Sequence, residues 1–84
     1  MELIDTIDLM TSDDYRARFR AEYWQTKIRY DRLHHILVQH EAGTLPFELN
    51  CPLEALEHQA HYMGNYLKTL EIRAEIEKID LSIR

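Results

Sequence analysis

Residues 41–52 read EAGTLPFELNCP, and this stretch decides the fold because it is the one clear interruption of a chain with helical patterning. Three of the four glycine and proline residues of the protein lie in it, namely Gly43, Pro46 and Pro52. Glycine favours the end of a helix, and proline favours the first turn of the next one. The stretch therefore predicts a loop that joins two helices.

Apolar residues on both sides of this loop follow the spacing of an amphipathic helix, with steps of four and three residues in turn. The two stripes are Phe19, Tyr23, Thr26, Tyr30, Leu33 and Leu37 before the loop, and Leu56, Ala60, Met63, Leu67, Leu70 and Ala74 after it. This spacing predicts an antiparallel helical hairpin with a coiled-coil-like seam. We expect its helices over about residues 13–40 and 52–78.

The remaining part of the chain fits the same all-α class. A short helix is expected over residues 2–10, which carry apolar side chains on one side. Thr11 or Ser12 is expected to cap the first long helix, with Asp13 and Asp14 at its positive N-terminus. Residues 1–84 are thus expected to form a single domain.

The first long helix carries a second apolar face. Ala17, Ala21, Trp24 and Ile28 lie on the side opposite the seam, because they are displaced from it by about half a turn. A hairpin covers only one face, so the other must meet the N-terminal helix, another protomer or a ligand. A chain of 84 residues with a single cysteine also has little other means of stabilisation. We therefore expect a homo-oligomer.

Charge is unevenly distributed along the chain, whose formal net charge is −5. Residues 1–14 hold five acidic side chains and no Lys or Arg, residues 15–35 hold six basic and two acidic ones, and residues 36–84 hold four basic and eight acidic ones. An acidic chain is a poor general binder of duplex nucleic acid, so that class is not expected. The basic middle segment still suits a small anionic ligand.

Residues 14–30, DYRARFRAEYWQTKIRY, combine this basic charge with aromatic side chains. Aromatic rings can stack on a base, and basic groups can hold phosphates. In the alternative interpretation, the tyrosines belong to the core and the basic residues form a solvated face with partners such as Lys27–Asp31. The candidate ligand-binding residues are Tyr15, Arg16, Arg20, Tyr23, Trp24, Lys27 and Arg29.

No motif for catalysis or for a cofactor accompanies these residues. The sequence has no phosphate-binding glycine loop, no catalytic triad and no metal-binding HExxH or CxxC pattern, and its five histidines are interpreted as ordinary polar residues. The N-terminus lacks the basic and apolar regions of a signal peptide, and no apolar run is long enough to span a membrane. A non-enzymatic protein without cofactor or metal, and without a membrane partner, is expected.

Two long stretches carry a resemblance to a known family. DLMTSDDYRARFRAEYWQTKIRYDRL (residues 8–33) and GTLPFELNCPLEALEHQAHYMGNYLKTLEIRAEIEKIDL (residues 43–81) resemble a family of small phage and prophage helical-hairpin proteins, related to a crAss-like-phage protein of unassigned activity. The resemblance covers nearly the whole chain. It implies a phage-encoded protein that works in the host cytoplasm, and it implies no particular activity.

A looser likeness is architectural. Phage proteins that sequester immune signalling nucleotides, the anti-CBASS and anti-Thoeris sponges, are also small helical hairpins that oligomerise and bind their ligands at protomer interfaces. This chain lacks their C-terminal motif, so the likeness transfers no residue role.

Two functional hypotheses follow from these observations. The first is a binding protein that sequesters an anionic signalling nucleotide, a cyclic nucleotide or an ADP-ribose derivative, at oligomer interfaces. The second is a protein-interaction module that inhibits a host or phage protein through an exposed face containing Trp24 and Ile28.

Overall fold

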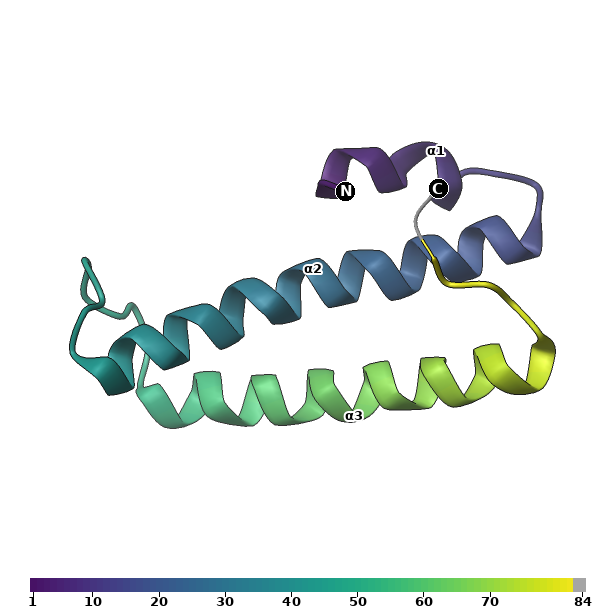
Figure 1. Cartoon of the computed structure of the whole chain (residues 1–84). Helices are drawn as coiled ribbons and strands as arrows, with labels where there is room; N and C mark the ends of the chain where they lie inside the picture. The colour runs from purple at the N-terminus through teal and green to yellow at the C-terminus, as the bar shows by residue number, and fades with distance from the viewer. Residues whose placement is uncertain (83–84) are drawn as a thin grey trace.

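The computed structural model describes residues 1–82 and shows helices joined by loops, with no strand among these residues (Figure 1). A 3₁₀ helix η1 (Leu3–Thr6) runs directly into α1 (Ile7–Met10), and the long helices are α2 (Tyr15–Ala42) and α3 (Leu53–Glu77). The predicted all-α class is confirmed, and each long helix ends within two residues of its expected bounds. No helix of the described residues is both long and apolar enough to cross a membrane.

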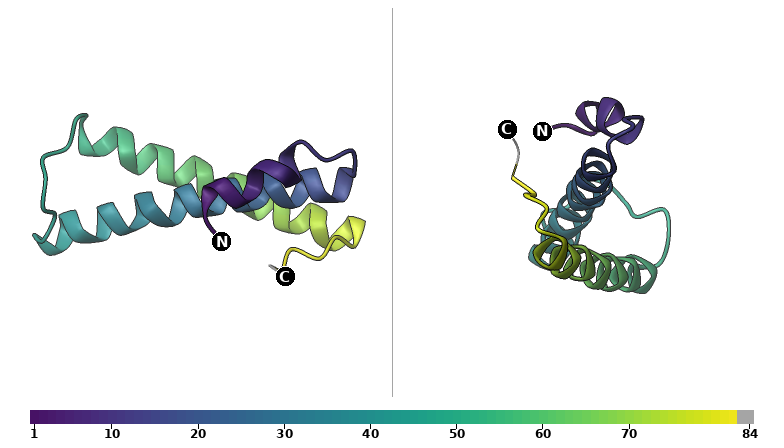
Figure 2. Two further views of the ribbon diagram at one scale, coloured as in Figure 1. Left: turned by 90° about the horizontal axis from the view of Figure 1, so that it is seen from above. Right: turned by 90° about the vertical axis from the view of Figure 1, so that its right-hand side faces the viewer.

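The two long helices cross obliquely, so that they are closest near their middles and separate toward both ends (Figure 2). The hydrophobic core lies between the two helices, on the side of this crossing that is away from the loop. It is built from the buried residues Phe19, Tyr23, Leu67, Leu70, Ala74 and Ile79, with Trp24, Tyr30 and Leu81 packed against it. The predicted seam is therefore buried in its residues farthest from the loop, whereas its middle members Thr26, Tyr30 and Met63 are half-buried.

Gly64 lies at this crossing. A Cβ atom added to Gly64 would have the hydroxyl end of the Tyr30 side chain as its nearest neighbour, at 3.5 to 3.8 Å. The tyrosine of α2 thus fills the space that a larger α3 residue would occupy. The position therefore has room for a methyl group but not for a large side chain.

Both long helices have defined ends. The side chain of Asp14 accepts a hydrogen bond of 3.0 Å from the backbone N–H of Arg16 and caps α2, and Ser12 instead accepts one from the backbone N–H of Asp14. The expectation of a Thr11 or Ser12 cap was therefore wrong by two or three residues. Gly43 ends α2 at φ 76°, a left-handed conformation that glycine adopts without strain.

The second apolar face of α2 is covered by the chain itself. η1 and α1 lie along the side of α2 that faces away from α3 (Figures 1 and 2), and Ala17 and Ala21 are buried there. The amide nitrogen of Gln25 lies 3.2 Å from the sulfur of Met10 in α1. Of the three coverings that the sequence left open, the N-terminal helix supplies the main one.

The expected exposed face around Trp24 and Ile28 is not present. Both residues are half-buried, and the Trp24 indole N–H donates a hydrogen bond of 2.7 Å to the carbonyl oxygen of Leu81. This contact exists because Lys78 ends α3 in a left-handed conformation, φ 55°, and turns the following residues back toward α2. The C-terminal segment therefore covers part of the surface that we had predicted to be free.

The Gly64 packing yields a prediction that can be measured. Gly64→Ala should raise the free energy of unfolding by about 0.5–1 kcal/mol, because the new methyl group meets Tyr30 at an ordinary contact distance and alanine has the better helix propensity. Gly64→Leu should lower it, because the larger side chain must displace the ring. Urea denaturation of the three proteins measures both changes, and a destabilised alanine variant would contradict the described packing.

Candidate ligand-binding site

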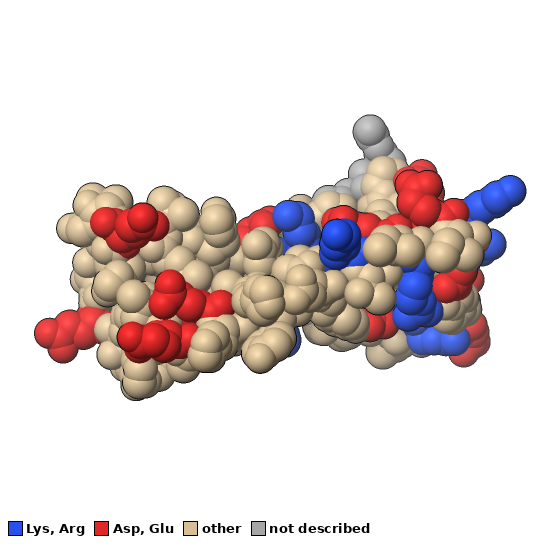
Figure 3. Space-filling view, turned by 90° about the horizontal axis from the view of Figure 1, so that it is seen from below, with Lys and Arg blue, Asp and Glu red and all other residues tan. Residues whose placement is uncertain are grey.

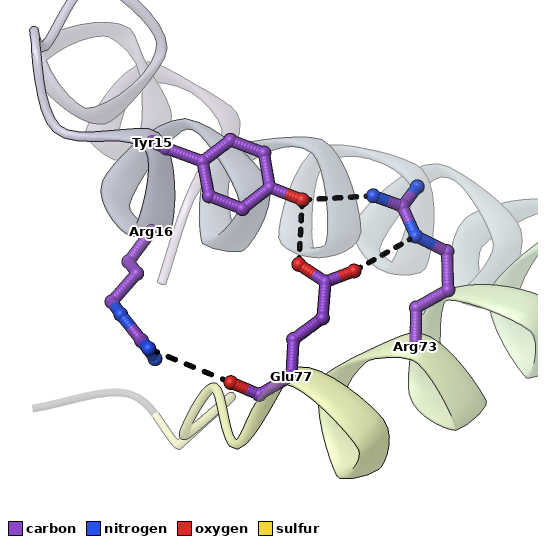
Figure 4. A network of polar contacts seen from close by, with 4 residues as sticks. All are labelled: Tyr15, Arg16, Arg73 and Glu77. Atoms are coloured by element: carbon purple, nitrogen blue, oxygen red, sulfur yellow. Dashed lines mark hydrogen bonds and ion pairs between the residues drawn. The ribbon is translucent and has the colours of Figure 1, made fainter.

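Tyr15 and Arg16 connect the start of α2 to the end of α3 (Figure 4). The Tyr15 hydroxyl donates a hydrogen bond of 2.7 Å to Glu77 and accepts one of 2.9 Å from Arg73, and Arg73 also pairs with Glu77 at 3.3 Å. Arg16 donates to the carbonyl oxygens of Lys78 and Glu77, at 2.9 and 3.5 Å. These carbonyls belong to the helix C-terminus, where a cation is favourable.

The network also sets the ionisation of its members. The hydrogen bond from Tyr15, together with the Arg73 guanidinium, lowers the pKa of Glu77 below its usual value. The same hydrogen bond to a carboxylate raises the pKa of Tyr15, because the phenol must keep its proton to donate. Tyr15 and Arg16, predicted to bind a ligand, are thus engaged in holding together two helix ends that would otherwise diverge.

Tyr23 belongs to the core rather than to an open pocket. It is only 7% exposed, and its hydroxyl donates a hydrogen bond of 2.8 Å to the Glu71 carboxylate on α3. Burial, followed by this hydrogen bond, raises the pKa of Tyr23 to about 12. Its ring meets Trp24 edge to face, with 5.1 Å between ring centres. Neither aromatic ring is free to stack fully on a ligand.

Lys27 has partners on its own helix. Its ammonium group lies 3.1 Å from the Asp31 carboxylate, as the pattern of the sequence indicated, and 5.8 Å from the centre of the Tyr30 ring. Tyr30 in turn stacks on His34, with 6.1 Å between ring centres. This pairing neutralises much of the charge of Lys27.

Arg20 and Arg29 differ from the other predicted residues. Within residues 1–82, neither side chain makes a hydrogen bond or an ion pair, and Arg29 is exposed while Arg20 is half-buried. Nine residues separate them, which corresponds to half a turn, so they lie on opposite sides of α2. The structure therefore does not bring the seven predicted residues together.

The surface hollows lie elsewhere. The three described hollows have volumes of about 430, 400 and 440 Å³, and none of them is lined by a predicted residue. Each contains at least one carboxylate: Glu48 lines the first, Glu71 and Glu75 the second, and Glu41 and Glu57 the third. Such linings do not favour an anionic ligand.

Two tyrosines of α3 were missed by the sequence analysis. Tyr62 is 68% exposed and Tyr66 is 42% exposed. Their separation by four residues, outside the apolar stripe of α3, is the signal that could have revealed them. They were overlooked because the basic segment lies on the other helix.

Helical spacing places Tyr66 and Arg29 on the same flank of the hairpin. The contact between Tyr15 and Arg73 marks this flank on both helices. Arg29 lies two heptads after Tyr15 on α2, and Tyr66 lies one heptad before Arg73 on α3. At 100° per residue, each therefore points within about 40° of the direction of its reference residue. We call the surface formed by Arg29, Tyr62 and Tyr66 the tyrosine flank.

No group suited to a metal ion accompanies the tyrosine flank. Across the part of the chain that the structure describes, no three His, Cys, Asp or Glu side chains are arranged to hold a metal. The chemistry available at the flank consists of exposed aromatic rings and an arginine without a partner. These groups bind by stacking and by charge-assisted hydrogen bonds.

Because burial and the hydrogen bond to Glu71 raise the pKa of Tyr23, we predict that the free energy of unfolding depends on pH in the alkaline range. The pKa of Tyr23 is higher in the folded protein than in the unfolded chain, so this contribution is complete below pH 10 and is lost as the pH rises toward 12. Between pH 9 and 11, the free energy of unfolding should fall by about 1 kcal/mol more in the wild type than in Tyr23→Phe. Denaturant titrations at several pH values measure this difference, and equal slopes would disprove the assigned pKa.

Comparison with known proteins finds one match, to the profile of a protein family. The profile of the Sequestin family matches residues 13–76, which include nearly all of α2 and α3 together with their loop. No curated protein and no solved structure matches the chain. The matched region contains the hairpin crossing and the tyrosine flank, and it covers more than half of the sequence. The chain therefore belongs to the Sequestin family.

Proposed function

We propose that this protein is a phage-encoded, non-catalytic binding protein that sequesters a small anionic ligand of the nucleotide type in the host cytoplasm. It would act as a homo-oligomer. The ligand class that we propose is the cyclic nucleotides and ADP-ribose derivatives expected from the sequence. The family name supports sequestration as the mode of action.

One observation carries the proposal: an arginine without a partner shares a flank with two exposed tyrosines. Arg29 makes no ion pair within residues 1–82, whereas Tyr66 and Tyr62 lie on that flank of the facing helix. A guanidinium group binds phosphate in bidentate fashion, and an exposed tyrosine ring stacks on a base. In the proposed complex, Arg29 contacts a phosphate of the ligand and Tyr66 stacks on its base.

The tyrosine flank also fits better than the opposite flank. On the opposite side, Lys27 is paired with Asp31, Tyr23 is buried, and Glu71 adds negative charge. Among the described residues of that side, Arg20 makes no hydrogen bond or ion pair. The second hypothesis, docking of a host protein on Trp24 and Ile28, has less support because both residues are half-buried.

A binding experiment with matched variants tests this proposal. Isothermal titration of the purified protein with a panel of cyclic dinucleotides, cyclic ADP-ribose isomers and ADP-ribose should yield at least one ligand. Arg29→Ala and Tyr66→Ala should each weaken its binding at least tenfold, because each removes one of the two proposed contacts. Arg20→Ala is the control, since it removes an equally unpaired arginine from the opposite side of α2.

The outcomes separate the possibilities clearly. A panel without any binding would overturn the proposed ligand class. Binding that is lost in Arg20→Ala and kept in Arg29→Ala would place the site on the opposite flank. Native mass spectrometry of protein purified from its host provides an independent readout, because a sequestered ligand should be released as a small mass on mild denaturation.

A further inference from the structure

The N-terminal segment, residues 1–12, lies along the side of α2 that faces away from α3 (Figure 1). Two contacts define its position on the helix. Near the end of the segment, the carbonyl oxygen of Ser12 accepts a hydrogen bond of 2.8 Å from Arg18. At its start, the Glu2 carboxylate lies 3.6 Å from the Arg32 guanidinium. The segment therefore runs antiparallel to α2 and places Glu2 at Arg32.

Packing of the segment against α2 keeps Glu2 in this place. Thr6 is fully buried, and Leu3 and Leu9 are half-buried, so every third residue is withdrawn from solvent. The Thr6 hydroxyl donates a hydrogen bond of 2.7 Å to the carbonyl oxygen of Leu3, which satisfies it inside the contact. The position of Glu2 thus follows from its packed neighbour Leu3 and does not depend on the ion pair alone.

Arg29 is the neighbour of Arg32 on the surface of α2. Residues three apart on a helix point about 60° apart, and their Cβ atoms are about 5–6 Å from each other. Arg29 belongs to the tyrosine flank, so Arg32 adds a second guanidinium group next to that flank. Each guanidinium can donate two parallel hydrogen bonds to a phosphate. The two arginines together therefore match an anion that carries two adjacent phosphates.

We propose that Arg29 and Arg32 form one site for a diphosphate group, and that Glu2 of the same chain competes with the ligand for Arg32. This inference rests on the proposed function, because it adds a second arginine and an internal competitor to the contact proposed for Arg29. The Glu2 carboxylate takes the place of a phosphate oxygen at Arg32. A diphosphate ligand must displace it before both arginines can bind. The N-terminal segment thus acts as an autoinhibitory element.

The ion pair that the ligand must break is weak. The side chains of Glu2 and Arg32 are 76% and 59% exposed, and their distance of 3.6 Å exceeds that of a charge-assisted hydrogen bond. Exposed ion pairs of this kind change an equilibrium by about fivefold at most. A phosphate can bind the same guanidinium through two hydrogen bonds and with more charge. Glu2 therefore weakens diphosphate binding without preventing it.

Glu48 provides a matched comparison for Glu2. Both are exposed glutamates, but Glu48 lies in the loop between α2 and α3 and makes no ion pair within residues 1–82. Residues 33–67 contain four glutamates and no Lys or Arg, and the charged side chains seen at the loop end from the α3 side are all acidic (Figure 3). Glu48→Gln thus removes the same charge as Glu2→Gln, at a distance from both arginines.

Titration with inorganic pyrophosphate at constant ionic strength tests the site. Arg29→Ala and Arg32→Ala should each weaken pyrophosphate binding by about tenfold or more, because each removes charge-assisted hydrogen bonds. Glu2→Gln should strengthen it by about two- to fivefold, because it removes the competitor. Glu48→Gln should leave the affinity unchanged. Chemical shifts of backbone amides measure binding in each variant, and circular dichroism verifies that all of them remain helical.

A double-mutant cycle distinguishes competition for Arg32 from a general effect of charge. Glu2→Gln should have no effect on pyrophosphate affinity in a chain that already carries Arg32→Ala, because the contested group is then absent. An effect that acts through the charge of the segment alone would persist in that chain. A gain that persists in the Arg32→Ala chain therefore overturns the role of Glu2 as a competitor.

The remaining outcomes separate this inference from the proposed function. Equal affinities of the wild type and Glu2→Gln overturn the competition, and an affinity unchanged in Arg32→Ala overturns the two-arginine site. Absence of pyrophosphate binding in both the wild type and Glu2→Gln also overturns it. Pyrophosphate carries no base, so a blank nucleotide panel would overturn the proposed ligand class and leave a pyrophosphate site standing. A nucleotide that binds through Arg29 and Tyr66 but not Arg32 would keep the proposed function and overturn this inference.

Discussion

The contact between Phe19 and Tyr23 of α2 and Leu67, Leu70 and Ala74 of α3 is the interaction on which the rest of the structure depends. It lies between the first third of α2 and the second half of α3, on the side of the crossing away from the loop, so the ends of the helices are held by other contacts. Near the N-terminus of α2, the Tyr15–Glu77–Arg73 network bridges the widening gap, and the turn at Lys78 returns Ile79 to the core. Near the loop, no side-chain hydrogen bond or ion pair joins α2 to α3 among the described residues, and a hollow lined by Leu37, Val38 and Leu53 opens between the helices.

This arrangement explains why an acidic protein gathers its aromatic and basic residues on one helix. Most of them serve the fold. Tyr23 fills the core, Trp24 bonds the returning C-terminal segment, Arg16 caps the end of α3, and Lys27 neutralises Asp31. Few aromatic or basic side chains of α2 are therefore free to bind a ligand. Arg29 is one of them, and it forms a candidate site only together with the exposed tyrosines of α3. The proposed site is thus a property of the hairpin and is not contained in either helix alone.

The helices, their loop and the central seam could be predicted from the sequence because each depends on local spacing and on glycine and proline. The roles of single side chains could not. Nothing in the spacing of Tyr15 and Tyr23 distinguishes a ligand-stacking ring from one whose hydroxyl reaches a carboxylate on the facing helix, since that partner is about fifty residues or more away in the chain. The covering of Trp24 likewise depends on residues after α3 and on the direction in which Lys78 turns them.

The separation of charge along the molecule has a consequence for how a ligand would approach. The chain extends 43 Å along its longest axis, whereas electrostatic fields decay over about 8 Å at physiological ionic strength. An anion near the end that holds the basic residues is therefore little affected by the four carboxylates of residues 33–67, and that end is close to neutral because its ten basic side chains face eleven acidic ones. Only in dilute salt would the field of the distant carboxylates extend to it. The protein behaves toward small ions as two electrically independent bodies, held at a fixed distance by a pair of helices.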